Sequence, residues 1–409
     1  MPDYNDIIQH RTDFPSLKRI HNGTPLIYLD GPGGTQVPQP VIDTMVHYYT
    51  NCNANTHGYF VTTMESDQII HETRKVTADF LGAAHDWEIS FGANMTTLNY
   101  ALARAIGRYL KPGDEILITQ LDHEANRGPW LSLRELGIVV REINILPDCT
   151  LDYDDLQRKV NESTRLIAMG WASNAFGTVN NVELVRKLSY QVGAWLLLDA
   201  VHYAPHFPID VKNTGSDFLL CSAYKFYGPH VGILYSRHGI LDRLETDRLR
   251  TQDQRAPYRI ETGTLNHAAL AGVKAAVEYI ATFGQGPSLR EKIIHAMTRI
   301  AEYEHYLARY LYKGLKPIKK LTVYGLPFND KRRTPTLSLT IEGKTPVEIC
   351  TCLDQRSICA WDGHFYAIRP VEVLGLLEKG GVTRLGVSLY NTKEEMDRVI
   401  EAIKFIAKE

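Results

Sequence analysis

The sequence predicts an α/β protein with a mostly parallel sheet, followed by a smaller α+β domain. Helical and strand-like segments alternate from about residue 38 to 280, as parallel strands joined by crossover helices require. Several strand-like segments are continuous apolar runs, which is typical of strands buried on both faces. The Gly-Gln-Gly-Pro sequence at 284–287 is the clearest break in the chain. We therefore expect an N-terminal segment over 1–37 that packs on the small domain, a large domain over 38–284 and a small domain over 285–409.

Hydrophobic spacing predicts the elements of the large domain one by one. Amphipathic patterns indicate helices over 41–49, 66–81, 96–110 and 266–283. Short apolar runs indicate strands over 88–91, 115–119, 139–145, 166–171, 195–198, 218–221 and 232–235.

The small domain is predicted to begin with a long amphipathic helix over 289–315. Strands are expected over 321–324, 336–341 and 384–387, with a strand-like run at 357–360. A helix over 393–408 closes the chain, and Asn391 or Thr392 is its expected N-cap.

Composition indicates a soluble cytoplasmic enzyme. The 409 residues carry a formal charge of −2 with no basic excess, so neither nucleic acid nor a membrane is an expected partner. The six cysteines lack zinc-ligand spacing, so we expect reduced thiols and no metal. The first residues do not form a signal peptide, and no apolar run approaches a membrane span.

Two short stretches carry the chemistry. Leu196–Ala200 (LLLDA) is an apolar run that ends in Asp199, and Ser222–Pro229 (SAYKFYGP) places Lys225 26 residues later. A lysine amine forms a Schiff base with the aldehyde of pyridoxal phosphate, and a carboxylate keeps the pyridine nitrogen protonated so that the ring withdraws electrons. The pair in this order predicts a pyridoxal phosphate enzyme.

Eight sequence blocks resemble the class V aminotransferase group, and specifically its cysteine desulfurase-like proteins of fold type I. The resemblance implies a pyridoxal phosphate-binding large domain with a seven-stranded type of sheet. The blocks keep the family's order along almost the whole chain: YLDGPGG (28–34), FGANMTT (91–97), LDHEAN (121–126), SNAFGT (173–178), LLLDAVHYAPH (196–206), SAYKFYGPHVGILY (222–235), ETGTLN (261–266) and RLGVSLYNT (384–392).

Three further cofactor residues follow from the resemblance. His123 matches the histidine that stacks on the pyridine ring and relays protons. Asn174 matches the residue that hydrogen-bonds a cofactor oxygen. His202 matches a residue that lies near the phenolic oxygen of the cofactor. His123 and Asn174 each follow a predicted strand, which places both at the carboxyl edge of the sheet, where open α/β folds bind ligands.

The phosphate is expected at the turn that contains Ala93 and Asn94, because this turn opens the predicted helix over 96–110 and helix N-termini bind anions. By resemblance, Ser222 contributes a hydroxyl, and Tyr224 stands where the family often has histidine. Thr264 resembles the threonine that reaches the phosphate of the neighbouring subunit, which implies a homodimer with shared active sites.

Among the residues expected to contact the substrate, one matches the family, and one loop departs from it. Arg384 matches the arginine that binds the substrate carboxylate, a role that suits a guanidinium. Desulfurases carry a nucleophilic cysteine on a loop that corresponds to 361–370, and here that loop has none. His364 and Tyr366 stand there instead, as a predicted acid–base pair or as substrate contacts. Cys359 precedes the loop on a run predicted to be a buried strand.

The leading prediction is carbon–sulfur lysis of cysteine or a derivative, with Lys225, His123, His364 and Tyr366 as catalytic residues. An aminotransferase or an epimerase on the same scaffold is the alternative, because the early steps are shared. A non-catalytic pyridoxal phosphate-binding regulator is a third possibility, which the complete set of cofactor residues disfavours.

Overall fold

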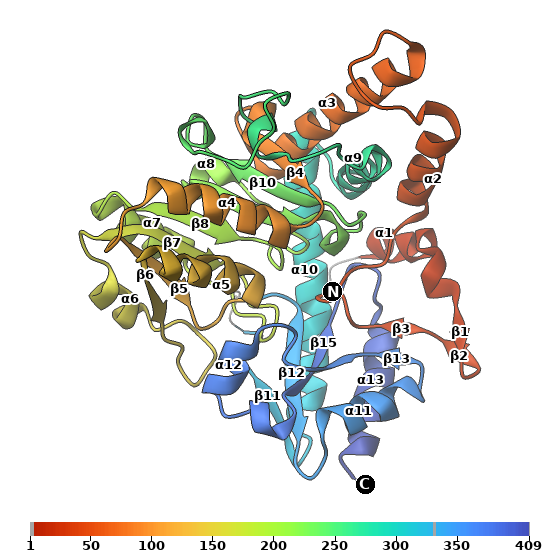
Figure 1. Cartoon of the computed structure of the whole chain (residues 1–409). Helices are drawn as coiled ribbons and strands as arrows, with labels where there is room; N and C mark the ends of the chain where they lie inside the picture. The colour runs from red at the N-terminus through yellow and green to blue at the C-terminus, as the bar shows by residue number, and fades with distance from the viewer. Residues whose placement is uncertain (1–3, 330–332, 409) are drawn as a thin grey trace.

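The computed structural model describes residues 4–329 and 333–408, and its centre is a seven-stranded sheet (Figure 1). The strand order is β4-β10-β9-β8-β7-β5-β6. The strands are β4 (Ile89–Gly92), β5 (Glu115–Thr119), β6 (Val139–Ile143), β7 (Thr164–Gly170), β8 (Trp195–Asp199), β9 (Phe218–Ser222) and β10 (Gly232–Ser236).

The sheet is parallel from β9 to β6, and β10 runs antiparallel to both of its neighbours. The predicted mostly parallel α/β class is therefore confirmed. β5, β8, β9 and β10 are buried along nearly their whole length, which explains why they read as continuous apolar runs.

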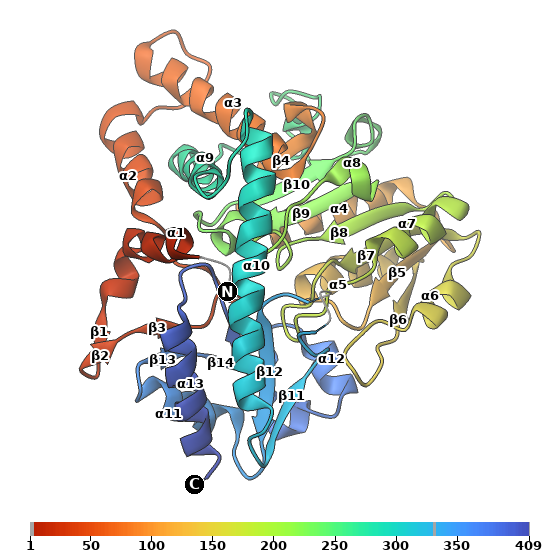
Figure 2. The same cartoon turned by 180° about the vertical axis from the view of Figure 1, so that it is seen from behind.

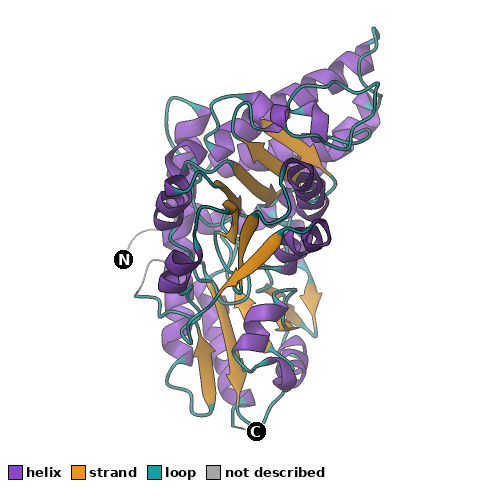
Figure 3. Ribbon diagram, turned by 60° about the vertical axis from the view of Figure 1, so that its left-hand side comes forward, coloured by secondary structure: helices purple, strands orange, loops and turns teal. Residues whose placement is uncertain are grey.

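Helices lie on both sides of the central strands (Figure 3). Those of the first 281 residues are α1 (Asn5–Ile8), α2 (Gln39–His47), α3 (Val61–Leu81), α4 (Met95–Tyr109), α5 (Glu124–Leu131), α6 (Tyr153–Lys159), α7 (Val182–Gln191), α8 (Val211–Thr214) and α9 (His267–Ala281). Polar side chains fix several starts: Asn94 caps α4 and Asn266 caps α9, each by accepting a backbone N–H of the first turn.

The second sheet has four strands in the order β11-β12-β15-β14, all antiparallel. They are β11 (Leu321–Tyr324), β12 (Thr336–Ile341), β14 (Trp361–Gly363) and β15 (Val382–Gly386). The helices of this part are α10 (Leu289–Leu315), α11 (Pro346–Asp354), α12 (Ile368–Val373) and α13 (Lys393–Ile406). Thr392 caps α13 through a capping box with Glu395, which decides between the two predicted caps.

The long helix α10 runs along both sheets (Figure 2) and packs against α3, α9, α13 and β12. Near the N-terminus, β1 (Ile20–His21) pairs with β2 (Thr24–Pro25), and β3 (Ile27–Tyr28) pairs with β13 (Ile358–Cys359). The N-terminal segment thus contacts the C-terminal part of the chain. The division into domains at residue 284 stays a prediction.

The structure corrects two local expectations. The segment 361–370 is not wholly a loop, because it contains β14 and the start of α12. The strand β15 begins at Val382, two residues before its predicted start at Arg384, and ends at Gly386. Within the described residues, no helix has the length and apolar character needed to cross a membrane.

Candidate active site

The predicted site residues meet at the carboxyl edge of the parallel sheet. β8 ends at Asp199, β9 ends three residues before Lys225, and His123 and Asn174 follow β5 and β7 by four residues each. Parallel neighbours end at the same edge, so residues far apart in sequence reach one place. The site is a consequence of strand order.

Lys225 is buried at the end of a short 3₁₀ turn, with 9% of its surface exposed. Its Nζ donates hydrogen bonds to the carbonyl oxygens of Pro32 and Gly33, the latter at 3.0 Å. Burial and, secondarily, the positive charge of Arg384 lower the pKa of Lys225 to about 7. A substantial fraction of this amine is therefore neutral, and so nucleophilic, near physiological pH.

Asp199 is fully enclosed at the end of β8. Its Oδ1 accepts the Val201 N–H at 3.0 Å, and no ion pair joins it to a described cation. Burial and the neighbouring charge of Asp122 raise its pKa to about 7. A buried carboxylate that lines a cavity without a counter-ion matches a ligand with a protonated nitrogen, such as a pyridinium ring.

Two neutral histidines line the same cavity. His123 caps α5 by accepting the Ala125 N–H on Nδ1 at 3.0 Å, and burial lowers its pKa to about 4. His202 Nε2 lies 3.1 Å from Thr334 Oγ1 and 3.0 Å from Thr336 Oγ1. Its Nδ1 is buried without a hydrogen-bond partner, so this atom is available to a polar group of a ligand.

We call the space beside these residues the inner cavity. It is lined by predicted cofactor residues from the ends of several strands and from the start of α4. These are Asn94, His123, Asn174, Asp199, His202, Ser222, Tyr224 and Lys225. Ser222 Oγ accepts the Met95 N–H at the start of α4, at 3.3 Å. The N-terminus of α4 is thus placed at the cavity, where a phosphate is favoured.

Two predicted cofactor residues lie elsewhere. Ala93 and Thr264 line a separate depression of about 430 Å³ on the other side of the α4 start. Thr264 is exposed, so its side chain is accessible to another molecule and does not reach the Lys225 of its own chain.

Lys225 also borders an outer cavity of about 320 Å³. This space shares Pro32, His123, Asn174, Tyr224 and Lys225 with the inner cavity. Its other walls come from β14, the following turn and β15: Trp361, Asp362, Gly363, His364, Phe365, Tyr366 and Arg384. The arrangement places Lys225 between a space suited to a cofactor and a space suited to a substrate.

Arg384 is held rigidly at the wall of the outer cavity. Its Nη2 pairs with Asp30 Oδ1 at 2.8 Å, and its Nη1 donates to the Asn174 carbonyl at 3.1 Å. The ring of Phe365 lies 4.1 Å from the guanidinium carbon, and the buried Nε has no hydrogen-bond partner. The guanidinium is thereby oriented in advance for an anionic group.

The turn after β14 brings His364 and Tyr366 beside the site. His364 Nδ1 accepts the Tyr366 N–H at 3.2 Å. The ring of Tyr366 lies 5.7 Å from the ring of His123 and is 67% exposed. Both predicted residues therefore border the outer cavity, with Tyr366 nearest to solvent.

Among the described residues, no cysteine lines either cavity. Cys359 pairs with Tyr28 in the short β13–β3 ladder, which confirms the predicted strand, but Cys359 is half-buried rather than buried. Burial raises the pKa of its thiol and also that of Cys350, the latter to about 12. Thiols with raised pKa values are poor nucleophiles at neutral pH.

Three residues of the site escaped the sequence analysis. Asp30 pairs with Arg384, Asp122 accepts the Gly170 and Thr119 N–H groups at the cavity wall, and Phe365 covers Arg384. Asp30 and Asp122 both lie inside blocks that resemble the family. The acidic residue within each of these two blocks could have indicated a site residue.

The chain is similar to known proteins along almost its whole length. Residues 27–399 match the family model described as aminotransferase class-V. A cysteine desulfurase of Yersinia pseudotuberculosis serotype O:1b (strain IP 31758) is 32% identical over 97% of both chains, and one of Yersinia pestis is also 32% identical over 97% of both.

Solved structures show the same fold. The apo structure of a cysteine desulfurase from Thermococcus onnurineus NA1 has a TM-score of 0.88 at 28% identity, and covers 100% of this chain and 99% of that one. A cysteine desulfurase from Escherichia coli has a TM-score of 0.85 at 23% identity, with 98% of each chain covered.

The chain belongs to the class V aminotransferase family. It is accordingly a pyridoxal phosphate-dependent enzyme of fold type I, as the sequence predicted. Asp199 without a counter-ion, the orphaned Nδ1 of His202 and the low pKa of Lys225 all fit this cofactor.

Proposed function

We propose that the protein cleaves the carbon–sulfur bond of cysteine or a cysteine derivative, with pyridoxal phosphate held by Lys225. The observation that carries the proposal is the position of Lys225, which borders both the inner and the outer cavity. The likeness to cysteine desulfurases over 97% of the chain supports the choice of a sulfur amino acid.

Each cavity residue has a role in this proposal. With the cofactor bound, Asp199 would hold the proton on the ring nitrogen, and neutral His123 would lie beside the ring without competing for that proton. When bound, the cofactor supplies a ring that stabilises negative charge at the substrate α-carbon. Lys225 accepts the α-proton because its pKa of about 7 leaves much of the amine unprotonated near neutral pH.

The outer cavity orients the amino acid. Arg384 binds the substrate carboxylate, and Asp30 keeps the guanidinium in place at 2.8 Å. His364 and Tyr366 exchange protons with the leaving group from the solvent side. Asn174 links the two cavities, since its Nδ2 donates to the Phe365 carbonyl at 2.9 Å while its side chain also lines the inner cavity.

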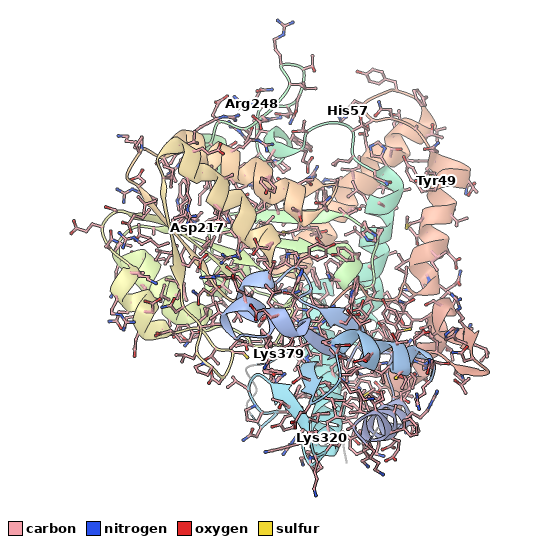
Figure 4. All side chains as sticks on the ribbon, turned by 60° about the horizontal axis from the view of Figure 1, so that its bottom comes forward. Tyr49, His57, Asp217, Arg248, Lys320 and Lys379 are labelled. Carbon is pink, nitrogen blue, oxygen red and sulfur yellow. The ribbon has the colours of Figure 1, made fainter. Side chains whose placement is uncertain are left out.

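We also propose that the active enzyme is a cytoplasmic homodimer. Thr264 is exposed and lies outside the inner cavity of its own chain, so it is placed to serve a neighbour. Large apolar side chains are exposed on the start of α3 and on the segment between α2 and α3: Tyr49, Tyr59, Phe60, Val61 and Met64. Figure 4 shows Tyr49, His57 and Arg248 at this end of the molecule, away from Lys320 and Lys379. Such a patch is typical of a protein interface.

The test is a product assay on the cofactor-loaded protein. Sulfur amino acids should release sulfide or a thiol together with pyruvate or alanine, and Lys225→Ala should abolish this release. If the protein instead passes its amino group to a keto acid without breaking a carbon–sulfur bond, the aminotransferase alternative is correct.

A further inference from the structure

We propose that the outer cavity takes a cysteine whose sulfur carries an apolar or aromatic substituent, and that the sulfur leaves as the corresponding thiol. This inference rests on the carbon–sulfur lysis proposed above and names its substrate class. Three properties of the cavity carry it: the chemistry of its walls, the fixed position of its turn and its size.

The first property is the lack of a sulfur acceptor. The described walls of both cavities contain no cysteine, and Tyr366 and His364 occupy the turn beside Lys225. A tyrosine hydroxyl does not accept sulfur from a substrate. The sulfur atom must therefore leave with whatever group it carries.

The second property is that the turn is tied to the large sheet. Asn174 Nδ2 donates to the Phe365 carbonyl at 2.9 Å, and the Glu124 N–H donates to the Tyr366 carbonyl at 2.8 Å. Phe365 and Tyr366 both have left-handed backbone angles, with φ of 54° and 57°. Non-glycine residues adopt this conformation at a cost, which the two hydrogen bonds offset. The turn is therefore a fixed wall of the outer cavity and does not move sulfur away from the site.

The third property is an aromatic wall around a large space. Trp361 pairs with Arg384 across β14 and β15, so the two side chains lie on the same face of the sheet. Tyr366 and Tyr224 complete the wall. Side chains of this kind bind apolar and aromatic groups by stacking and edge contacts.

The volume also exceeds what cysteine needs. The outer cavity has a volume of about 320 Å³. Sites for drug-sized ligands begin at about 300 Å³. An amino acid held by Arg384 and Lys225 would leave the space beside Trp361 and Tyr366 unfilled if its side chain ended at a thiol.

The reaction balances without an oxidant or a second thiol. The α-proton passes to Lys225, the bond between the β-carbon and sulfur breaks with its electron pair on sulfur, and the thiolate takes up a proton. Water then hydrolyses the three-carbon fragment. One S-substituted cysteine and one water give one pyruvate, one ammonium and one thiol, with Tyr366 or His364 nearest to the departing sulfur.

The test begins with binding, measured by calorimetry on the cofactor-loaded protein. The probe is the carbon isostere of S-benzyl-L-cysteine, in which a methylene replaces sulfur so that no cleavage occurs. It should bind at least tenfold more tightly than L-alanine. Trp361→Ala should weaken its binding about tenfold, and Trp361→Phe should restore it to within about threefold, while neither substitution changes the binding of L-alanine.

Trp87→Ala is the matched control, because Trp87 is 45% exposed against 49% for Trp361 and lies outside the outer cavity. It should alter neither affinity. S-benzyl-L-cysteine itself should yield equal amounts of thiol and pyruvate. Tight binding of the isostere without thiol release overturns the proposed carbon–sulfur lysis. Cleavage of cysteine, with the isostere bound no more tightly than L-alanine, overturns the substrate class alone.

Discussion

Asp199→Asn is predicted to stabilise the cofactor-free protein while it damages the loaded enzyme. The carboxylate is buried near the charge of Asp122, and among the described residues only the Val201 N–H donates a hydrogen bond to it, at 3.0 Å. An asparagine keeps an oxygen in place to accept that N–H. The substitution therefore removes the buried charge and little else.

The size of the effect follows from the pKa of Asp199, which burial raises from 3.8 to about 7. Because the folded state binds this proton more tightly than the unfolded state, the free energy of unfolding falls as the pH rises from about 4 to about 7. At about 1.4 kcal/mol per pKa unit, the cost above pH 7 reaches about 4 kcal/mol. Below pH 4 both states are protonated and the cost vanishes.

Urea unfolding of the cofactor-free variant and parent at pH 4 and pH 8 measures this difference. The variant should be up to about 4 kcal/mol more stable at pH 8 and nearly equal to the parent at pH 4. Asp155→Asn is the control of opposite sign. Burial raises the pKa of Asp155, but the hydrogen bonds from Lys159 Nζ at 2.7 Å and from the Asn144 N–H at 2.9 Å, together with nearby positive charge, outweigh burial and lower that pKa. The Asp155→Asn variant should therefore be less stable than the parent at pH 8. Equal stabilities for Asp199→Asn and the parent at pH 8 would refute the reasoning.

The remaining predictions concern turnover and assembly. Capture of pyridoxal phosphate by the cofactor-free protein should accelerate as the pH rises through about 7, where Lys225 loses its proton; stopped-flow absorbance measures the rate. Mixing Lys225→Ala chains with Thr264→Ala chains should restore part of the activity, because one of the two shared sites then carries neither defect; no recovery after demonstrated subunit exchange would count against shared sites. A folded variant without cysteines should keep its turnover in a single-turnover assay, and a persulfide on the parent protein by mass spectrometry would contradict this. Tyr366→Phe or His364→Ala should slow turnover by about a hundredfold. A change below threefold in both variants would show that neither residue acts as a general acid or base.

The sequence predicted the central sheet well because its strands are buried on both faces. β5, from Glu115 to Thr119, has the bounds that its apolar run indicated, and the other six strands agree to within a few residues. The helix α10 also has its predicted bounds, Leu289–Leu315, because its amphipathic repeat is long and Ser288 caps it. The helices α5, α6, α7 and α11 have caps as well, but they are too short for a long amphipathic repeat and were not predicted.

The contacts around the outer cavity could not be predicted from the sequence, because they depend on pairing between distant parts of the chain. Asp30 and Arg384 are separated by 354 positions, and the parallel bridge between Asp30 and Gly386, the last residue of β15, helps to bring their side chains to 2.8 Å. The left-handed angles of Phe365 and Tyr366 have no glycine to signal them. Both carbonyls accept hydrogen bonds from distant parts of the chain, namely the first residue of α5 and Asn174 in the segment after β7.

The measurement that tests the account most directly is the covalent position of the cofactor. The protein loaded with pyridoxal phosphate is reduced with borohydride, digested and mapped by mass spectrometry, with Lys225→Ala treated in parallel. The account predicts a single modified peptide that carries the pyridoxyl group on Lys225 and none at that peptide in the variant. A label on another lysine, with the same yield in both proteins, would contradict the assignment of Lys225 and of the two cavities built around it.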